Sequence, residues 1–90
     1  MVKLRLFSAL REIAGSKEVD VEVEDISIKG ALEKFVEKYG EKARRILFNK
    51  DGELGPSVLL LVNGETAPDG GETRVSSGDT IQVLLPTAGG

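Results

Sequence analysis

The stretch SIKGALEKFVEKYG, residues 27–40, carries the main amphipathic pattern of this 90-residue chain. Its apolar residues recur at helical spacing, so they form one stripe and leave the charged residues on the opposite face. Ser27 is a good N-cap because its hydroxyl can accept a hydrogen bond from an orphan backbone amide, and Gly40 is a typical helix stop. The pattern predicts one main helix, whose buried stripe is Ile28, Leu32, Phe35, Val36 and Tyr39.

Two β-strands are predicted before this helix. Residues 2–6 alternate apolar with basic side chains, and residues 18–24 alternate valines with acidic side chains. Alternation with period two is typical of a strand that is buried on one face only. Between the two strands, residues 8–15 hold a short helical turn that ends at a glycine. We therefore expect the strands to form a hairpin with a long connection.

A short second helix and further strands are predicted after the main helix. Residues 41–48 continue in helical spacing, and the loop that follows is rich in turn residues. Residues 58–62 are continuously apolar and end at an Asn-Gly turn, which is typical of a central strand. Residues 80–85 alternate again and form the last strand, with one minor strand before it.

This order of elements favours one helix that covers one face of a small mixed sheet. If the first two strands form a hairpin, the last strand lies beside the first in parallel. The prediction is an α+β, β-grasp (ubiquitin-like) fold with a mixed four- to five-stranded sheet, one main helix and a short second helix. We expect one β-grasp domain over residues 1–85 and a flexible C-terminal Gly-Gly tail over residues 86–90.

The composition excludes several kinds of functional site. The chain has neither Cys nor His, so it lacks a thiolate nucleophile, an imidazole base and the soft metal ligands. We therefore expect no metal site and no bound cofactor. Twelve basic and 15 acidic residues give a net charge of −3, and aromatic residues make up only 4%. Both values disfavour nucleic acid as a direct ligand.

The sequence also gives no sign of a membrane segment. The longest apolar run, residues 58–62, is far shorter than the about 20 residues that span a bilayer. The N-terminal residues lead into alternating charge rather than the apolar block of a signal peptide. We expect a cytoplasmic protein without a membrane partner.

Four landmarks resemble the ubiquitin-like sulfur carriers, with the small subunit of molybdopterin synthase as the nearest likeness. They are the opening VKLRLFSALREIAG, the step Val62-Asn63-Gly64-Glu65, the turn Gly78-Asp79 and the terminal LPTAGG. The likeness covers nearly the whole chain. Tails of this family often read Pro-Pro-Val-Ala-Gly-Gly, so Leu85 and Thr87 depart from the pattern and leave the acceptor partner open.

The resemblance implies a chemical use for the last residues. In such carriers an ATP-dependent adenylyltransferase activates the C-terminal carboxylate, and sulfur from a sulfur donor protein then displaces AMP. Here the product would be a thiocarboxylate on Gly90. Pro86, Thr87, Ala88 and Gly89 would form the tail that enters the partner's site, reaching about 16 Å. Glycine suits a narrow channel because it has no Cβ, and Pro86 would end the strand pairing.

Three functions remain open on the sequence. The first is a sulfur carrier for molybdenum cofactor biosynthesis, in which the large subunit of molybdopterin synthase takes the tail and supplies the catalytic machinery. This chain would then be a cosubstrate without an active site of its own. The second is a protein modifier joined through Gly90 to target lysines, or a carrier for thiazole or tRNA thiolation. The third is a β-grasp interaction module whose terminal glycines are an incidental frayed end.

A possible interface is predicted on the sheet face that points away from the main helix. Alternate residues of the central strand face the helix, so Leu59 and Leu61 face away, as do Leu84 on the last strand and Phe7 after the first. Exposed apolar patches of this kind mark protein interfaces. The alternative is that the loop over residues 49–57 folds over the patch.

Overall fold

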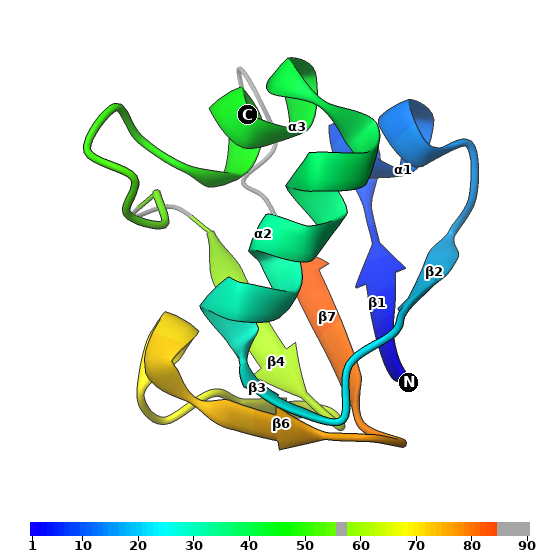
Figure 1. Ribbon diagram of the computed structural model, residues 1–90, viewed down its shortest axis with the longest axis vertical. Helices are drawn as coiled ribbons and strands as arrows, with labels where there is room; N and C mark the ends of the chain where they lie inside the picture. Colours follow the sequence, from blue (N-terminus) through cyan, green and yellow to red (C-terminus); the bar gives the residue numbers. More distant parts are fainter. Residues whose placement is uncertain (56–57, 85–90) are drawn as a thin grey trace.

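A long helix lies across a mixed β-sheet (Figure 1). The computed structural model describes residues 1–55 and 58–84 of the chain. Within these residues, five strands form the main sheet in the order β2-β1-β7-β4-β5. The strands are β1 (Val2–Leu6), β2 (Glu18–Val21), β4 (Leu59–Val62), β5 (Glu65–Thr66) and β7 (Thr80–Leu84).

The strand that comes last in the sequence occupies the middle of the sheet. β7 pairs in parallel with β1 and antiparallel with β4, and β1 forms the predicted antiparallel pair with β2. Leu6 lies opposite Val83 across the parallel pair, and Leu59 lies opposite Leu84 across the antiparallel pair. This topology confirms the predicted β-grasp fold.

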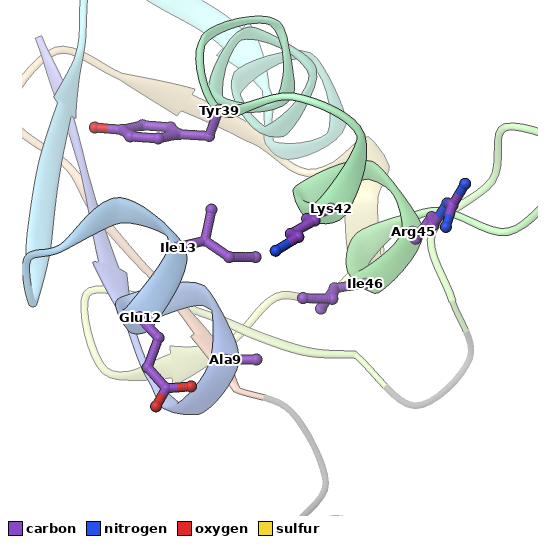
Figure 2. Close-up of a pocket in the computed structure, with 7 residues that line it drawn as sticks. All are labelled: Ala9, Glu12, Ile13, Tyr39, Lys42, Arg45 and Ile46. Carbon is purple, nitrogen blue, oxygen red and sulfur yellow. The ribbon is translucent and has the colours of Figure 1, made fainter.

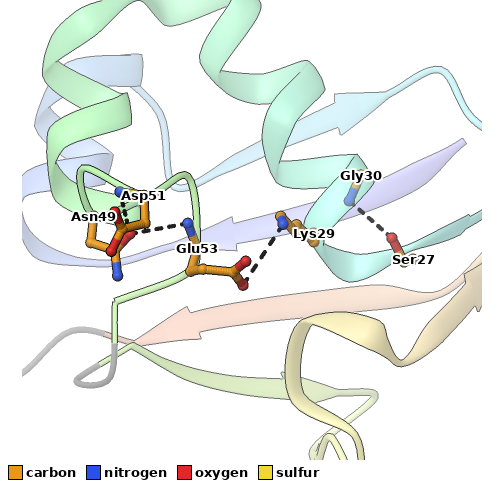
Figure 3. Close-up of polar contacts among 6 residues, drawn as sticks. All are labelled: Ser27, Lys29, Gly30, Asn49, Asp51 and Glu53. Atoms are coloured by element: carbon orange, nitrogen blue, oxygen red, sulfur yellow. Dashed lines mark hydrogen bonds and ion pairs between the residues drawn. The ribbon is translucent and has the colours of Figure 1, made fainter.

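The described residues form three α-helices: α1 (Ser8–Ala14), α2 (Ile28–Tyr39) and α3 (Glu41–Leu47). α2 is the predicted main helix. Its cap is also as predicted, because the Ser27 hydroxyl accepts a hydrogen bond from the Gly30 amide at 3.1 Å (Figure 3). Gly40 follows the helix with φ 89° and ψ −163°, a conformation that glycine adopts more easily than other residues.

α1 occupies the residues in which the sequence predicted a short helical turn, 8–15. It has seven residues, as many as α3, so the fold has two short helices beside α2 rather than one. Gly15 ends α1 in the left-handed conformation, with φ 73°, and its amide donates to the Arg11 carbonyl. The buried side chain of Leu10 attaches the helix to the core.

The hydrophobic core lies between α2 and the sheet. The inward-facing residues of β1 and β7 are fully buried, and so is most of the predicted stripe of α2. Tyr39, at the C-terminal end of the stripe, is only partly buried. The largest fully buried side chains are Leu4, Leu6, Leu10, Ile28, Leu32, Leu47, Ile81, Val2, Val75 and Val83.

A second, two-stranded sheet was not predicted from the sequence. β3 (Asp25–Ser27) pairs antiparallel with β6 (Arg74–Ser76), and the Arg74 guanidinium lies 3.2 Å from the Asp25 carboxylate. The strand predicted over residues 18–24 therefore ends early, at Val21. The chain turns there, since the Val23 amide donates to the Val21 carbonyl at 2.9 Å.

The loop after α3 folds towards the helix side of the sheet. Asn49 shapes this loop, because its side-chain oxygen accepts hydrogen bonds from the amides of Asp51 and Glu53 (Figure 3). Glu53 also lies 3.9 Å from the ammonium of Lys29 on α2. Leu54 packs closely on the 3₁₀ turn η1 (Gly70–Glu72). A Cβ added at Gly71, the middle residue of this turn, would lie only 2.6 Å from Leu54 Cδ1.

Candidate functional site

The predicted apolar patch lies on the sheet face opposite α2. Leu60 and Val83 are buried beneath the helix, so the alternating residues of the same strands point to the other face. Leu59 and Leu84 lie directly opposite each other, at a spacing that brings their side chains into contact. Leu61 follows two residues after Leu59 on the same face. Leu59 is 48% exposed, and Leu61 and Leu84 are partly exposed beside it.

Phe7 extends this patch across β1. It follows Leu6, whose strand partner is Val83, and it keeps an extended backbone with φ −136° and ψ 158°. Continued alternation places its side chain on the outer face, level with Leu84. We call Phe7, Leu59, Leu61 and Leu84 the outer patch.

The described part of the loop after α3 packs on the helix side of the sheet. Residues 49–55 contact α2 and η1 there. The exposure of Leu59 agrees with this arrangement.

Basic side chains border the outer patch on the same face. Arg5 lies opposite Gln82, which in turn lies opposite Leu61. Lys3 is two residues before Arg5 on the same face and lies 3.6 Å from the carboxylate of Glu18. On this face Arg5 lies opposite Glu18 and Lys3 lies opposite Asp20, so basic and acidic side chains stand side by side next to the outer patch.

The predicted reactive residue, Gly90, lies outside the described residues, as do Pro86, Thr87, Ala88 and Gly89. The structure does show the strand that comes before them in the sequence. Leu84 ends β7 between β1 and β4, within the outer patch. The sequence therefore enters the predicted tail directly from the predicted interface.

A polar network holds the other end of β7, where the sequence indicated only two turns. The side-chain amide of Asn63 donates to Asp79 Oδ1 at 3.0 Å, and its oxygen accepts from the Thr80 amide at 2.9 Å. The Ser76 amide donates to Asp79 Oδ2 at 2.8 Å. Asn63 and Gly64 both have positive φ, 51° and 89°, as a type I′ hairpin turn requires. The network therefore fixes the register that sets Leu59 against Leu84.

These hydrogen bonds also change the acidity of Asp79. The bond from the Ser76 amide, followed by the bond from Asn63, lowers the pKa of this carboxyl below its usual value of 3.8. A carboxylate that accepts hydrogen bonds in the folded state gains stability from its charged form. The network is therefore a pH-dependent link between the two turns.

Acid should remove the contribution of this network to stability. Because the folded-state pKa of Asp79 is lowered, the contribution is fully present above pH 3.8 and is lost as the pH falls through the folded-state value. We expect the intact protein to be more stable than Asp79→Asn at neutral pH, with the gap closing in acid. Urea unfolding of both proteins across a pH series measures the gap. A difference that does not change with pH would contradict the prediction.

An open groove separates α1 from α3 (Figure 2). Glu12 lies on its α1 side, and Lys42 and Arg45 lie on its α3 side. Arg45 is already 3.7 Å from the carboxylate of Glu41. Tyr39, the last residue of the predicted helical stripe, also lines the groove, and the mixed charges around it define no ligand.

Residues 1–55 and 58–84 hold neither a cluster of metal ligands nor a membrane-spanning helix. No three acidic side chains in them come together to hold a metal ion. No helix among them is long and apolar enough to cross a membrane.

Known proteins resemble the chain over nearly its whole length. The family model described as the ThiS family matches residues 4–90. Small archaeal modifier protein 3 of Haloferax volcanii is 35% identical, over 99% of this chain and 98% of that protein. The crystal structure of SAMP1 from Haloferax volcanii matches with a TM-score of 0.82 and 34% identity, over 99% of this chain and 98% of that one. A chain of the Amycolatopsis orientalis BexX/CysO complex matches over 100% of both chains, with a TM-score of 0.79 and 25% identity.

Proposed function

The chain belongs to the ThiS family of ubiquitin-like sulfur carriers, and on that premise we propose that it carries sulfur on the C-terminal carboxylate of Gly90. The observation that supports this most directly is the position of β7. This central strand ends at Leu84 within the outer patch, and the sequence continues from there to Gly90. A partner that docks on the outer patch would therefore receive the reactive end beside it.

The proposed reaction has two steps. The Gly90 carboxylate attacks the α-phosphorus of ATP in an activating enzyme, so pyrophosphate leaves and an acyl adenylate forms. A hydrosulfide equivalent from the sulfur donor then adds to the carbonyl carbon, and AMP leaves with the electron pair of the broken C–O bond. The product is a thiocarboxylate. Activation is needed because a free carboxylate has no good leaving group.

This chain contributes the carboxylate and the docking surface, and its partners contribute the catalytic groups. The absence of Cys and His from the sequence agrees with that division of roles. The outer patch supplies apolar contact, and the paired charges of β1 and β2 beside it form a polar border. The activating enzyme and the sulfur-accepting enzyme would use this face in turn.

The specific acceptor that we propose is the large subunit of molybdopterin synthase. In that role the tail would enter the large subunit's active site, and the thiocarboxylate sulfur would pass to the pterin precursor. The chain would act as the small subunit and cosubstrate of the synthase.

A second candidate is protein modification. Its support is the relative from Haloferax volcanii that is named a small archaeal modifier protein. The same acyl adenylate would serve, with the amine of a target lysine attacking the carbonyl carbon and AMP leaving, so that an isopeptide bond forms. Carriers for thiazole or tRNA thiolation share the first step as well.

Intact-mass spectrometry tests the activation step common to these functions. The protein is incubated with its cognate activating enzyme, ATP and sulfide. We expect it to gain the mass difference between sulfur and oxygen, within the C-terminal peptide and only when ATP is present. No ATP-dependent change would leave the interaction module as the remaining function. The mass spectrum of the cellular pool then separates a free thiocarboxylate from conjugates with other proteins.

Replacing Leu59 by Thr should weaken activation without unfolding the protein. Thr has a β-branched side chain that suits a strand, and the change removes the most exposed apolar group of the outer patch. We expect kcat/KM of the activating enzyme for this carrier to fall about tenfold, as for truncation of a contact at the centre of an interface. Glu22→Thr, an exposed change outside the patch, is the control. Equal rates for the two variants would exclude the outer patch from this interface.

A further inference from the structure

The groove between β2 and α2 combines an open strand edge with an apolar floor. β2 stands at the edge of the main sheet and pairs only with β1 among the described strands. Figure 1 shows it at the side of the molecule with no strand beyond it. An uncovered edge of this kind is a template on which another extended chain can pair.

The register shows which backbone groups face outward from this edge. The Leu6 amide donates to the Lys17 carbonyl at 2.7 Å, so Leu6 and Lys17 form a hydrogen-bonded pair. Antiparallel strands alternate such pairs with pairs that point their backbone groups away. By this alternation, the backbone groups of Glu18 and Asp20 point away from β1.

Only one of these two residues has its outward groups occupied. The Ser16 hydroxyl donates to the Glu18 carbonyl at 2.8 Å and accepts from the Glu18 amide at 3.3 Å. No hydrogen bond is found for the outward amide and carbonyl of Asp20 within the part of the chain that the structure describes. Asp20 therefore offers a donor and an acceptor to an added strand.

The side chains beside this edge form a site with apolar walls. Val19 and Val21 of β2 line it on one side, and Phe35 and Tyr39 of α2 line it on the other. The two aromatic rings lie 4.7 Å apart between centroids. An extended segment that pairs with Asp20 would direct alternate side chains towards these walls.

Two lysines of α2 also line the groove. Lys34 and Lys38 are four residues apart and exposed, and like charges at this spacing repel each other on a helix. The Lys38 ammonium lies 5.5 Å from the centre of the Tyr39 ring. The acidic residues that also line the groove, Asp20 and Glu22, belong to the sheet side. An acidic side chain at the helix rim would relieve the repulsion between the lysines.

We propose that this groove binds an extended segment of a partner protein, which adds as a strand to the edge of β2. The segment has apolar side chains at alternate positions and one or two acidic residues that reach Lys34 and Lys38. Main-chain hydrogen bonds to Asp20 and apolar contacts with the groove hold the segment in place, as in other strand-addition complexes.

This site goes beyond the proposed sulfur-carrier function. Its contacts lie on the helix side of the sheet and at the β2 edge, whereas the outer patch lies on the opposite face. The two surfaces can therefore be occupied at the same time. Binding is non-covalent and needs neither ATP nor Gly90, so its test is independent of the test for activation.

The probe is a synthetic peptide, Glu-Glu-Thr-Val-Thr-Ile-Thr-Val-Gly-Ser, blocked at both ends and titrated into ¹⁵N-labelled protein. We expect saturable shifts of the amide resonances in residues 19–22 and 34–39, with a Kd of about 0.1 mM, typical of a short single-strand contact. A second peptide carries N-methyl groups on alternate central amides, which removes the strand donors, and should not bind. A third, with Lys in place of both Glu, should bind about fivefold more weakly.

Two protein variants separate the backbone contact from the charge contact. Asp20→Pro removes the outward amide but no bond to β1, since proline is tolerated on an edge strand where the amide faces solvent. It should lose peptide binding. Lys34→Gln with Lys38→Gln should weaken binding of the glutamate peptide about fivefold. The matched control, Lys42→Gln with Lys50→Gln, makes the same change of net charge outside the groove and should bind as the parent does.

Several results would overturn the proposal. They are the absence of saturable shifts at about 1 mM peptide, shifts centred on β4 and β7, and equal binding of the N-methylated peptide. If Asp20→Pro does not fold, the N-methylated peptide still decides whether the backbone contact exists. If the two double variants bind equally, the lysines are not part of the site.

Discussion

Replacing Leu32 by Ala should lower the free energy of unfolding by about 2–5 kcal/mol, the range for large-to-small changes in a packed core. Leu32 is 0% exposed in the middle of α2, on the face that covers the sheet. Ala is the best helix former, so the loss comes from the cavity and not from the helix itself. Urea denaturation followed by circular dichroism measures it.

Glu33→Ala is the matched control for this prediction. It makes the same type of substitution one residue along the same helix, on the exposed face, and should change the free energy of unfolding by less than about 0.5 kcal/mol. If Leu32→Ala were as mild as this control, α2 would have to present a different face to the sheet.

The C-terminal residue should be the most sensitive position for function. Changing Gly90 to Trp, or adding one residue after it, should reduce ATP-dependent activation by a factor on the order of 100 or more. The reacting carboxylate would be blocked or displaced, and a misplacement of about 1 Å can cost that much in rate. Intact-mass spectrometry after incubation with the activating enzyme, ATP and sulfide measures the remaining activation.

Stability measurements separate this loss from unfolding. Both Gly90 variants, and a protein without Gly89 and Gly90, should unfold within about 0.5 kcal/mol of the parent, because these residues follow the last core strand. Lys50→Trp, which adds the same bulky side chain in the exposed loop after α3, should be activated normally. If the extended protein were activated as well as the parent, Gly90 would not be the reactive residue.

The parts of the fold that were predicted from the sequence are those with a regular pattern. The period-two alternation of residues 2–6 predicted β1 and its buried face. The helical stripe between Ser27 and Gly40 predicted the bounds of α2. The parallel pairing of β1 with β7 followed because a hairpin and a single covering helix leave only that place for the last strand.

The parts that were missed are short or depend on distant residues. β3 and β6 have three residues each, which is too few for a period to appear. α1 was predicted in the right place but only as a turn, because a terminal glycine and one buried leucine also fit a single turn. The network of Asn63 and Asp79 joins residues 16 positions apart, and each looked like an ordinary turn residue.

The candidate surfaces also differ in how far the sequence could predict them. The outer patch was predictable because alternation assigns every second residue of a strand to one face, and Leu59 followed from that rule. The groove beside β2 was not predictable, since it depends on which strand stands at the edge of the sheet and on where α2 crosses it. Lys34 and Lys38 look like ordinary solvent-exposed lysines until Val19 and Val21 are placed beside them.

Because β7 is central in the sheet but last in the sequence, the sheet can close only late in the synthesis of the chain. A ribosome adds about 5–20 residues per second from the N-terminus, so β1 and β4 are made well before the strand that joins them. Until residues 80–84 are added, the nascent chain exposes two unpaired strand edges and lacks Ile81 and Val83 from its core. Pairing between such distant segments is a slow part of folding. Chains released early therefore keep aggregation-prone edges and also lack Gly90, so the order of synthesis couples a closed sheet to the presence of the residue for which we propose reactivity.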